Sequence, residues 1–392
     1  MTYNFDEPVA RQGTNCVKYD LRKDIFGTAD IIPMWVADMD FNSPPFIIDA
    51  MRKRLGHEVL GYTLKGEEYF SSITGWMSRR HSWQIKDDWI SFSPGIVPAI
   101  NICILAYTRP GDKVIIQPPV YFPFFNAVTD HGRRLVYNQL ITEQGIWKID
   151  FDDLEQKAAE GAKMLILSSP HNPVGRSWKR DELKRLAEIC LQHGLIIISD
   201  EIHSDLVLPG HNHIPLAGIS DSIADITLTC MAPSKTFNIA GLSTSSMIIS
   251  NPELKKKFDA TINSLHISGG NIFGTEASVA AYSQGDRWLD ELLVYIKNNI
   301  DHVVSRLSAQ NLIKPVYPEA TYMIWLDCRA MKMGPDELNN FFVSGASVGL
   351  SEGSVFGPGG EGFMRMNIAC PLSTVNKALD NIENALSKLK IK

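Results

Sequence analysis

The sequence lacks long apolar runs and any large excess of one charge. Its longest apolar stretches, at 114–116, 164–167 and 195–198, are far shorter than the ~20 residues that a membrane-spanning helix needs. The formal net charge of −6 gives no electrostatic reason to bind DNA, RNA or an anionic membrane. A soluble protein is expected, and 44% hydrophobic residues over 392 positions can form more than one lobe.

Cysteine is also scarce, and its wide spacing favours reduced thiols over a disulfide framework. No Cys-x-x-Cys pair is present, and the first residues, MTYNFDEPVAR, contain no basic segment followed by an apolar one. We therefore expect no signal peptide and interpret the thiols as reduced core residues of a cytoplasmic protein. The six cysteines are Cys16, Cys103, Cys190, Cys230, Cys328 and Cys370.

The middle of the chain alternates short apolar runs with a helical pattern. The apolar runs end at polar or turn residues and predict buried strands of a mostly parallel sheet. Between two of them, residues 183–190 have helical apolar spacing, and Gly194 stands where a helix-ending glycine belongs. This succession predicts an α/β fold. The runs lie at 113–119, 164–170, 195–201, 226–230 and 245–250.

The pattern changes near residue 290 and predicts a second, α+β domain. A long helix is expected from Trp288 to about Ala309, and a final amphipathic helix from Thr374 to Leu389. Strand-like YMIWLDC and FMRMNIAC lie between them, with a helix from Asp336. The predicted division is an N-terminal segment that joins the small domain (1–49), a large α/β domain (50–288) and a small C-terminal α+β domain (289–392).

Polar residues follow three of the predicted strands, at the points where the strands end. Asn172 follows the second run, Asp200 the third, and Ser234 and Lys235 the fourth. In open α/β sheets, ligands bind beyond the carboxyl ends of the strands, so an amide, a carboxylate and an amine should meet there. The stretch 93–99 precedes a helix-like run whose first N–H groups would receive a phosphate.

Each of these groups suits one part of pyridoxal 5′-phosphate (PLP) chemistry. A desolvated lysine amine such as Lys235 can attack an aldehyde. A buried carboxylate such as Asp200 can keep a pyridine nitrogen protonated, and the amide of Asn172 can bond the ring oxygen. Taken singly, an aspartate after a strand is often a helix cap and a Ser-Lys pair is usually at the surface. Their shared strand-end placement favours the PLP interpretation.

Four stretches carry a resemblance to a known family. HNPVG (171–175), ISDEIHSD (198–205) and APSKTFNIAGL (232–242) resemble central motifs of fold-type I PLP enzymes of the class I and II aminotransferase family. The stretch DEIHSD and the opening PMWVADMDF (33–41) resemble the branch of cystathionine β-lyases and related C–S lyases. The resemblance implies a mostly parallel central sheet flanked by helices in a large PLP-binding domain, a smaller α+β domain, and a homodimer with a shared active site.

The resemblance also implies roles for individual residues at the cofactor. Lys235 would form the Schiff base with PLP and carry the proton from the substrate Cα. Asp200 would pair with the pyridine nitrogen, and Asn172 would contact the ring oxygen and the substrate carboxylate. Tyr121 would stack on the ring, with a core aromatic as the alternative. The phosphate would be held by Gly95, the amides of Ile96 and Val97, and Ser234.

Further residues would bind substrate or reach across the dimer. Arg365 would bind the substrate α-carboxylate, because a guanidinium fork matches a carboxylate; the alternative is a strand-edge arginine that reaches water. Trp35 and Val36 would also contact substrate. Tyr62, in GYTLKG, would reach the cofactor phosphate of the partner subunit, with an ordinary turn tyrosine as the alternative.

Two positions depart from the aminotransferase pattern and favour the lyase branch. His203, a predicted cofactor contact, stands where many aminotransferases of the family carry a tyrosine that bonds the ring oxygen. Ser243 stands where they carry a phosphate-binding arginine. The favoured activity is therefore α,β-elimination on a small sulfur amino acid, such as cystathionine or cysteine, which yields a thiol, pyruvate and ammonia. Transamination by the same early steps is the alternative.

Two other functions and one metal site are weaker hypotheses. A binding protein that keeps PLP as a structural relic conflicts with the retained lysine, aspartate, asparagine and arginine. A nicotinamide dehydrogenase is disfavoured, because the literal G-x-G-x-x-G at 357–362 contains Pro358 and runs into a strand-like segment. His203, His211 and His213 lack a completing ligand set, so we expect no metal and interpret His211 and His213 as solvated loop histidines.

Overall fold

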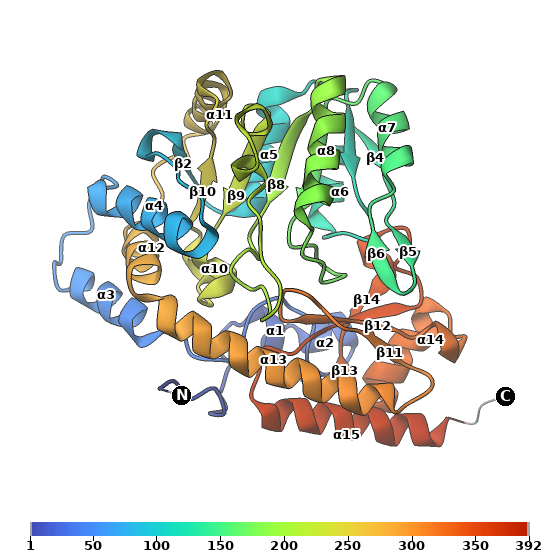
Figure 1. Cartoon of the computed structure of the whole chain (residues 1–392). Helices are drawn as coiled ribbons and strands as arrows, with labels where there is room; N and C mark the ends of the chain where they lie inside the picture. The colour runs from blue at the N-terminus through green and yellow to red at the C-terminus, as the bar shows by residue number, and fades with distance from the viewer. Residues whose placement is uncertain (1, 390–392) are drawn as a thin grey trace.

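The computed structural model describes residues 2–389 and contains two main sheets, one above the other in Figure 1. Met1 and residues 390–392, at the ends of the predicted N-terminal segment and C-terminal domain, lie outside the described residues. The larger sheet has seven strands in the order β2-β10-β9-β8-β7-β3-β4. Their bounds are β2 Ile90–Ser93, β3 Lys113–Ile116, β4 Arg134–Tyr137, β7 Met164–Ser168, β8 Ile196–Asp200, β9 Thr227–Met231 and β10 Ser245–Ile248.

The pairing within this sheet confirms the predicted α/β fold. Strands β4, β3, β7, β8 and β9 are parallel to one another, whereas β10 runs antiparallel to both β9 and β2. All five predicted apolar runs form strands. The sheet also includes β2 and β4, which were not predicted as strands.

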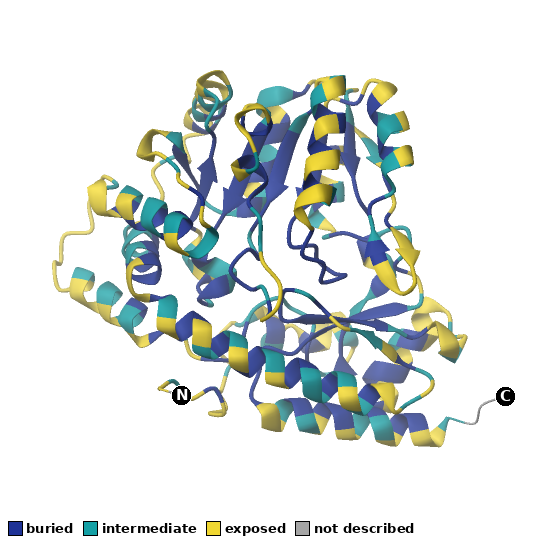
Figure 2. Ribbon diagram, in the orientation of Figure 1, coloured by how far each residue is buried: buried dark blue, intermediate teal, exposed yellow. Residues whose placement is uncertain are grey.

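Alternate residues of the central strands face opposite layers of helices. Met164 and Ile166 pack with helices α5, α6 and α11, while Leu165 and Leu167 pack with α7, α8 and α9. Because both faces are covered, the central strands are mostly apolar and almost entirely buried, and Figure 2 shows them buried while the outer helix faces are exposed. The bounds are α5 Ile96–Tyr107, α6 Pro123–Thr129, α7 Phe151–Ala159, α8 Arg180–His193, α9 Asp221–Ala224 and α11 Pro252–Ser264.

The smaller sheet is antiparallel and packs against two long helices. Its strand order is β11-β12-β15-β14, with β15 between β12 and β14. The predicted long helices are present as α13 (Asp286–Ser308) and α15 (Leu372–Lys388), and the predicted helix near Asp336 is α14 (Pro335–Asn340). The strands are β11 Lys314–Val316, β12 Met323–Asp327, β14 Ser351–Glu352 and β15 Phe363–Asn367.

The first fifty residues run along the smaller sheet as short elements joined by irregular chain. Phe5, Met34 and Met39 lie in one core cluster with residues of α13 and α15. Strand β1 (Ile32–Pro33) pairs in parallel with β13 (Val348–Gly349), which attaches the segment near the smaller sheet. This places residues 34–41 between the two main sheets. The helices here are α1 Val17–Asp20, α2 Arg22–Phe26 and α3 Pro45–Leu55.

Three remaining helices and one hairpin complete the described chain. Helices α4 (Glu67–His81), α12 (Ile272–Gln284) and the one-turn α10 (Pro233–Thr236) lie on the β2 side of the large sheet (Figure 1). Strands β5 (Ile141–Glu143) and β6 (Ile146–Lys148) form a hairpin. Short helical turns of 3-10 or π geometry span 87–89, 216–218, 240–242, 329–331, 341–345 and 353–356.

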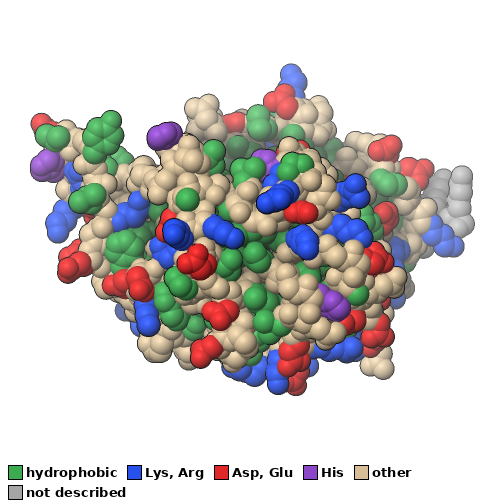
Figure 3. Space-filling view, turned by 90° about the horizontal axis from the view of Figure 1, so that it is seen from above, with side chains coloured by type: hydrophobic (Ala, Val, Ile, Leu, Met, Phe, Trp, Pro, Cys, Tyr) green, Lys and Arg blue, Asp and Glu red, His purple; other side chains and the backbone are tan. Residues whose placement is uncertain are grey.

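Surface charge agrees with the modest net charge of the sequence. On the face in Figure 3, positive, negative and apolar side chains are interspersed, with no broad area of one sign. Among residues 2–389, no helix combines the length and apolar character required to cross a membrane.

Candidate active site

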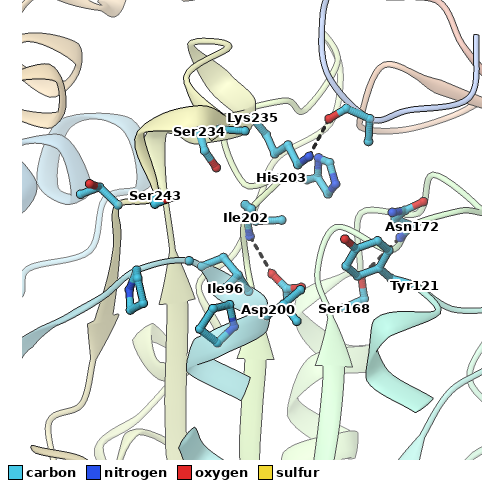
Figure 4. A pocket seen from close by; sticks show the side chains of 17 residues that line it. Ile96, Tyr121, Ser168, Asn172, Asp200, Ile202, His203, Ser234, Lys235 and Ser243 are labelled. Atoms are coloured by element: carbon cyan, nitrogen blue, oxygen red, sulfur yellow. Dashed lines mark hydrogen bonds between the residues drawn. The ribbon is translucent and has the colours of Figure 1, made fainter. Parts of the chain in front are cut away.

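A cavity of about 200 Å³ lies beyond the carboxyl ends of β7, β8 and β9 (Figure 4). The smaller sheet and residues 34–41 face it from the other side. Every residue that was predicted to bind cofactor lines this cavity, except Tyr62. They are Gly95, Ile96, Val97, Tyr121, Asn172, Asp200, His203, Ser234 and Lys235.

One end of the cavity is suited to a phosphate. Strand β2 leads through Pro94 and Gly95 into α5, so the first helical residues Ile96 and Val97 present N–H groups that have no partner within the helix. A helix start attracts anions through these groups. Hydroxyl donors join them from Ser234, Ser243 and Thr244, which also line the cavity.

Asp200 stands at the end of β8 as a buried carboxylate with few partners. It is 4% exposed, and it accepts one hydrogen bond, from the backbone N–H of Ile202 at 3.2 Å. Burial raises the pKa of Asp200 to about 7, although the Ile202 bond and the charge of Lys235 oppose the shift. A carboxylate in this state is stabilised by a cationic partner, such as the protonated nitrogen of a pyridine ring.

Lys235 lies on α10 and points toward His203 across the cavity (Figure 4). Its Nζ donates a hydrogen bond to the carbonyl oxygen of Ala37 at 2.6 Å. Burial, together with the charge of Arg365, lowers the pKa of Lys235 to about 8, against the opposing charges of Asp38 and Asp200. A substantial neutral fraction of the amine therefore exists near neutral pH, which is what attack on an aldehyde requires.

Arg365 is a buried guanidinium without a carboxylate partner in the described chain. It is 4% exposed, and it donates to Asn172 Oδ1 at 3.0 Å, to the carbonyl oxygen of Trp35 at 2.8 Å and to Ser351 Oγ at 3.2 Å. Its Nε has no partner among the described residues, and burial lowers its pKa to about 10. Since β15 is an interior strand, the alternative of an edge arginine that reaches water is wrong.

These groups together fit PLP and an amino acid. The helix start and hydroxyls match a phosphate, Asp200 matches the ring nitrogen, and Lys235 matches the aldehyde. A buried, unpaired guanidinium is unfavourable unless an anion reaches it, so Arg365 matches a substrate carboxylate.

Comparison with known proteins agrees with this geometry. The family model described as aminotransferase class I and II matches residues 29–382. The chain belongs to this family. The match confirms the resemblance of the HNPVG, ISDEIHSD and APSKTFNIAGL stretches.

Several relatives within the aminotransferase class I and II family are carbon–sulfur lyases by name. Cystathionine β-lyase PatB of Bacillus subtilis is 46% identical over 386 residues, which cover 98% of this chain and 100% of that protein. Protein MalY of Escherichia coli is 32% identical over 99% of this chain and 100% of its own. The relatives named as cystathionine β-lyases, PatB among them, support the predicted branch.

Solved structures of the family superpose over nearly the whole chain. Cystalysin from Treponema denticola, which contains PLP, matches with a TM-score of 0.95 and 38% identity over 100% of both chains. The PLP-bound C–S lyase from Staphylococcus hominis matches with a TM-score of 0.92 and 35% identity over 99% of both chains.

His203 and Tyr121 border the region between Lys235 and Asp200 (Figure 4). His203 is buried, and its Nδ1 has no partner among the described residues. Burial, with the charges of Lys235 and Arg365, lowers the pKa of His203 to about 3, so the imidazole is neutral. Tyr121 is half-buried and leans toward Asn172, which leaves its ring face available to a ligand.

Residues 35–38 contribute backbone groups to the site. The carbonyl oxygen of Trp35 accepts from Arg365, and that of Val36 accepts from Asn367 Nδ2 at 2.6 Å. The carbonyl oxygen of Ala37 accepts from both Lys235 and the hydroxyl of Tyr322, the latter at 3.1 Å.

The sequence analysis missed several residues at the site. Ala37 and Tyr322 were not predicted, although both lie within segments that were noted, PMWVADMDF and YMIWLDC. Ser168, Ile202 and Thr244 also line the cavity and were not named. An apolar tyrosine-containing strand gives no signal by itself that its hydroxyl faces a site.

Tyr62 lies away from the cavity of its own chain. It belongs to the segment 56–66 between α3 and α4, and its relative exposure is 113%. The described chain therefore does not bring Tyr62 to the other predicted site residues.

Of the two histidines that were expected to be solvated in the loop, His211 and His213, only His211 is exposed. His213 is buried against Glu201, with 2.8 Å between Nε2 and Oε2, and His203 lines the cavity. The expectation of a solvated loop histidine was wrong for His213, because Glu201 points into the interior and pairs with it. His211 alone of the three is exposed. Among residues 2–389, no group of three histidine, cysteine or acidic side chains is arranged to hold a metal.

Proposed function

We propose that the protein is a PLP-dependent carbon–sulfur β-lyase that converts a sulfur amino acid to a thiol, pyruvate and ammonia. The observation that carries the proposal is the cavity lined by Lys235, Asp200 and Asn172, beside which the Arg365 guanidinium donates to Asn172 without a carboxylate partner among the described residues. Relatives named as cystathionine β-lyase and C–S lyase support the reaction class. When bound, PLP supplies an aldehyde that captures the substrate amine and a ring that stabilises negative charge at Cα.

The cofactor would be held at three points of the cavity. The N–H groups of Ile96 and Val97 and the hydroxyl of Ser234 would bind the phosphate. Asp200 would keep the ring nitrogen protonated, because an ion pair in this buried position stabilises both partners. Gly95, Tyr121 and His203 would complete the contacts with the phosphate and the ring.

The substrate would be oriented by its carboxylate. Arg365 would bind both carboxylate oxygens, with Asn172 beside it, since these two side chains already contact each other at 3.0 Å. Trp35 and Val36 would border the bound amino acid, through the segment whose carbonyl oxygens bond Arg365 and Asn367. The reacting Cα–H bond would then lie within reach of Lys235.

Lys235 would carry the proton of the reaction. Its neutral amine would take the proton from Cα, and the Cβ–S bond would break with the electron pair leaving on sulfur. The protonated amine would return that proton to the departing thiolate. The released enamine reacts with water to give pyruvate and ammonia. A pKa of about 8 suits an amine that must both accept and donate this proton near neutral pH.

We also propose a homodimer in which Tyr62 of the partner subunit reaches the cofactor phosphate. Its support is the exposure of Tyr62 among apolar neighbours of the segment 56–66. The two separate sheets support the division into residues 1–49, 50–288 and 289–392. Six cysteines without disulfides support a cytoplasmic location.

One assay separates this function from transamination. Purified protein with added PLP is given L-cystathionine or L-cysteine, and pyruvate and free thiol are both quantified after an absorbance scan for bound cofactor. Pyruvate and thiol in equal amounts are expected. A cofactor band with amino transfer that requires an added keto acid, and without thiol release, would instead assign the aminotransferase activity. Absence of any cofactor band would contradict both.

A further inference from the structure

The side chains of the DEIHSD stretch divide between the cavity and the interior. Asp200 and His203 line the cavity, whereas Asp205 is buried on the side toward α4. Asp205 accepts from Trp76 Nε1 at 2.9 Å, lies 2.8 Å from His81 Nε2, and accepts from the hydroxyl of Thr236 at 2.8 Å.

These bonds keep Asp205 ionised inside the protein. Burial by itself would raise the pKa of Asp205, but the hydrogen bonds from His81, Thr236 and Trp76 outweigh it and lower the pKa. Hydrogen bonds to a buried charged acceptor are among the strongest and most directional in proteins. Asp205 is therefore a fixed acceptor that sets the position of each donor.

One of the three donors belongs to the helix of the lysine. Thr236 is fully buried and follows Lys235 directly on α10. This helix is a single turn, with Phe237 N–H bonded to the Pro233 carbonyl as its cap, so it has little internal rigidity. Its orientation depends on side-chain anchors, and Thr236 is the anchor nearest to Lys235.

We propose that Asp205 is a positioning residue for Lys235 and Ser234, acting through the Thr236 hydroxyl, with α4 as the fixed support behind it. The proposal rests on the assigned roles of Lys235 and Ser234 at PLP. Asp205 itself does not line the cavity. Its place in the DEIHSD stretch then has a physical reason: the stretch carries the carboxylate for the ring and, five residues later, the carboxylate that holds the lysine helix.

The test compares two ways of removing one hydrogen bond from Asp205. Thr236→Val removes the bond that leads to α10 and keeps the side-chain shape. Trp76→Phe removes the bond from α4 and keeps an aromatic ring against Phe237, the residue that caps α10. Thr236→Ser keeps the hydroxyl and serves as the rescue. For each protein, PLP affinity is measured by absorbance titration of the cofactor-free form, and the pH midpoint of the cofactor band and the melting temperature are recorded.

The expected results differ between the two sites. Thr236→Val should weaken PLP affinity about tenfold, the effect of one hydrogen bond to a charged group. It should also shift the pH midpoint by about half a unit, because the lysine no longer sits at its original distance from Asp200 and Arg365. Thr236→Ser and Trp76→Phe should keep both values close to those of the unmodified protein, even where Trp76→Phe lowers the melting temperature.

Other outcomes overturn the proposal. Thr236→Val with unchanged affinity and midpoint, or Trp76→Phe with an equal shift, would make Asp205 a purely structural residue. If Thr236→Val does not fold, Asp205→Asn decides by the same two measurements. An unmodified protein without a cofactor band would overturn the proposed function as well, whereas a normal band with no difference among the variants overturns this inference alone.

Discussion

The strand-end wall, the side of the cavity formed at the ends of β7, β8 and β9, differs from the segment 56–66 in burial and in bonding. At the wall, Asn172 and Asp200 are buried and bonded to groups of the same chain. In the segment, Tyr62 and Leu64 are almost entirely exposed, and Figure 2 shows the connection between α3 and α4 exposed along its length. Apolar side chains exposed together in this way mark an interaction surface.

The contrast separates the parts of the active site that one chain forms by itself from the part that requires a second subunit. The wall holds the amine, the carboxylate and the guanidinium in fixed positions through contacts within the chain. Among residues 2–389, no hydrogen bond holds the exposed side chain of Tyr62, although the family resemblance gives that residue a cofactor role. We infer that the chemical groups depend on this chain's own folding, and that Tyr62 depends on a second copy.

Replacing Lys235, in the strand-end wall, should have the largest effect on activity. Lys235→Ala removes the only amine in the cavity lining of the described chain, so pyruvate formation should fall by at least ~10³-fold, the scale of lost proton-transfer catalysis. Lys256→Ala, on the exposed face of α11, is the control and should retain full activity. Substantial pyruvate formation by folded Lys235→Ala protein would exclude the lysine as proton carrier.

The parts of this wall that were predictable from sequence are those encoded locally. Asn172, Asp200 and Lys235 each follow an apolar run directly, so strand ends and the rule for open sheets placed them together. The contact of Arg365 with Asn172 spans 193 residues, and no local pattern encodes it. Strand topology across the whole chain is needed to see that β15 faces the ends of β7 and β8.

The two strands that were not predicted, β2 and β4, and the wrong expectation for His213 have similar causes. Strand β4 lies at the sheet edge with exposed and half-buried residues, and β2 (ISFS) alternates serines with apolar residues although all four are buried. Both therefore lack the continuous apolar run of an interior strand. His213 sits in a polar loop sequence, and its burial depends on the inward direction of Glu201, which the sequence does not specify.

Replacing Arg365 should impair substrate binding more than cofactor binding. Arg365→Met leaves a carboxylate without its partner, and the KM for L-cystathionine should rise about 10²-fold, since losing one member of a buried charged pair corresponds to roughly 2–5 kcal/mol. PLP affinity should stay nearly unchanged. Arg329→Met, at an exposed arginine of the same lobe, is the matched control. An equal loss in kcat with no change in KM would argue against carboxylate binding.

Mixing two variants tests which subunit of the dimer supplies Tyr62 to each active site. Lys235→Ala and Tyr62→Ala proteins are each impaired, the second through phosphate contact and by about tenfold in PLP affinity. In a mixed dimer with Tyr62 acting across the interface, one site contains unmodified Lys235 and unmodified Tyr62. About a quarter of all sites in a random equal mixture should then be intact, given a symmetric dimer.

The control for this experiment is the same mixture without subunit exchange. Activity measured at low PLP should rise after exchange under mild denaturant and should remain at the sum of the separate variants without it. No rise after verified exchange would place Tyr62 in the site of its own chain, or outside the site altogether.

The smallest expected effect concerns Asp200 in the protein without cofactor. The pKa of this carboxyl is raised by burial to about 7 in the folded chain, above its ordinary value of 3.8. Between these values the folded state retains a proton that the unfolded state has lost, so the free energy of unfolding decreases as pH rises through this window. Asp200→Asn removes the penalty of burying the charge.

The cofactor-free Asn variant should therefore melt a few degrees above the unmodified protein at pH 8, and the difference should shrink at pH 5.5. Saturating PLP should reverse the order at pH 8, because the carboxylate then has a cationic partner that only the unmodified protein can bind as an ion pair. Asp152→Asn, at an exposed carboxylate, should show neither trend. A melting difference that is independent of both pH and PLP would mean that Asp200 does not face the ring nitrogen.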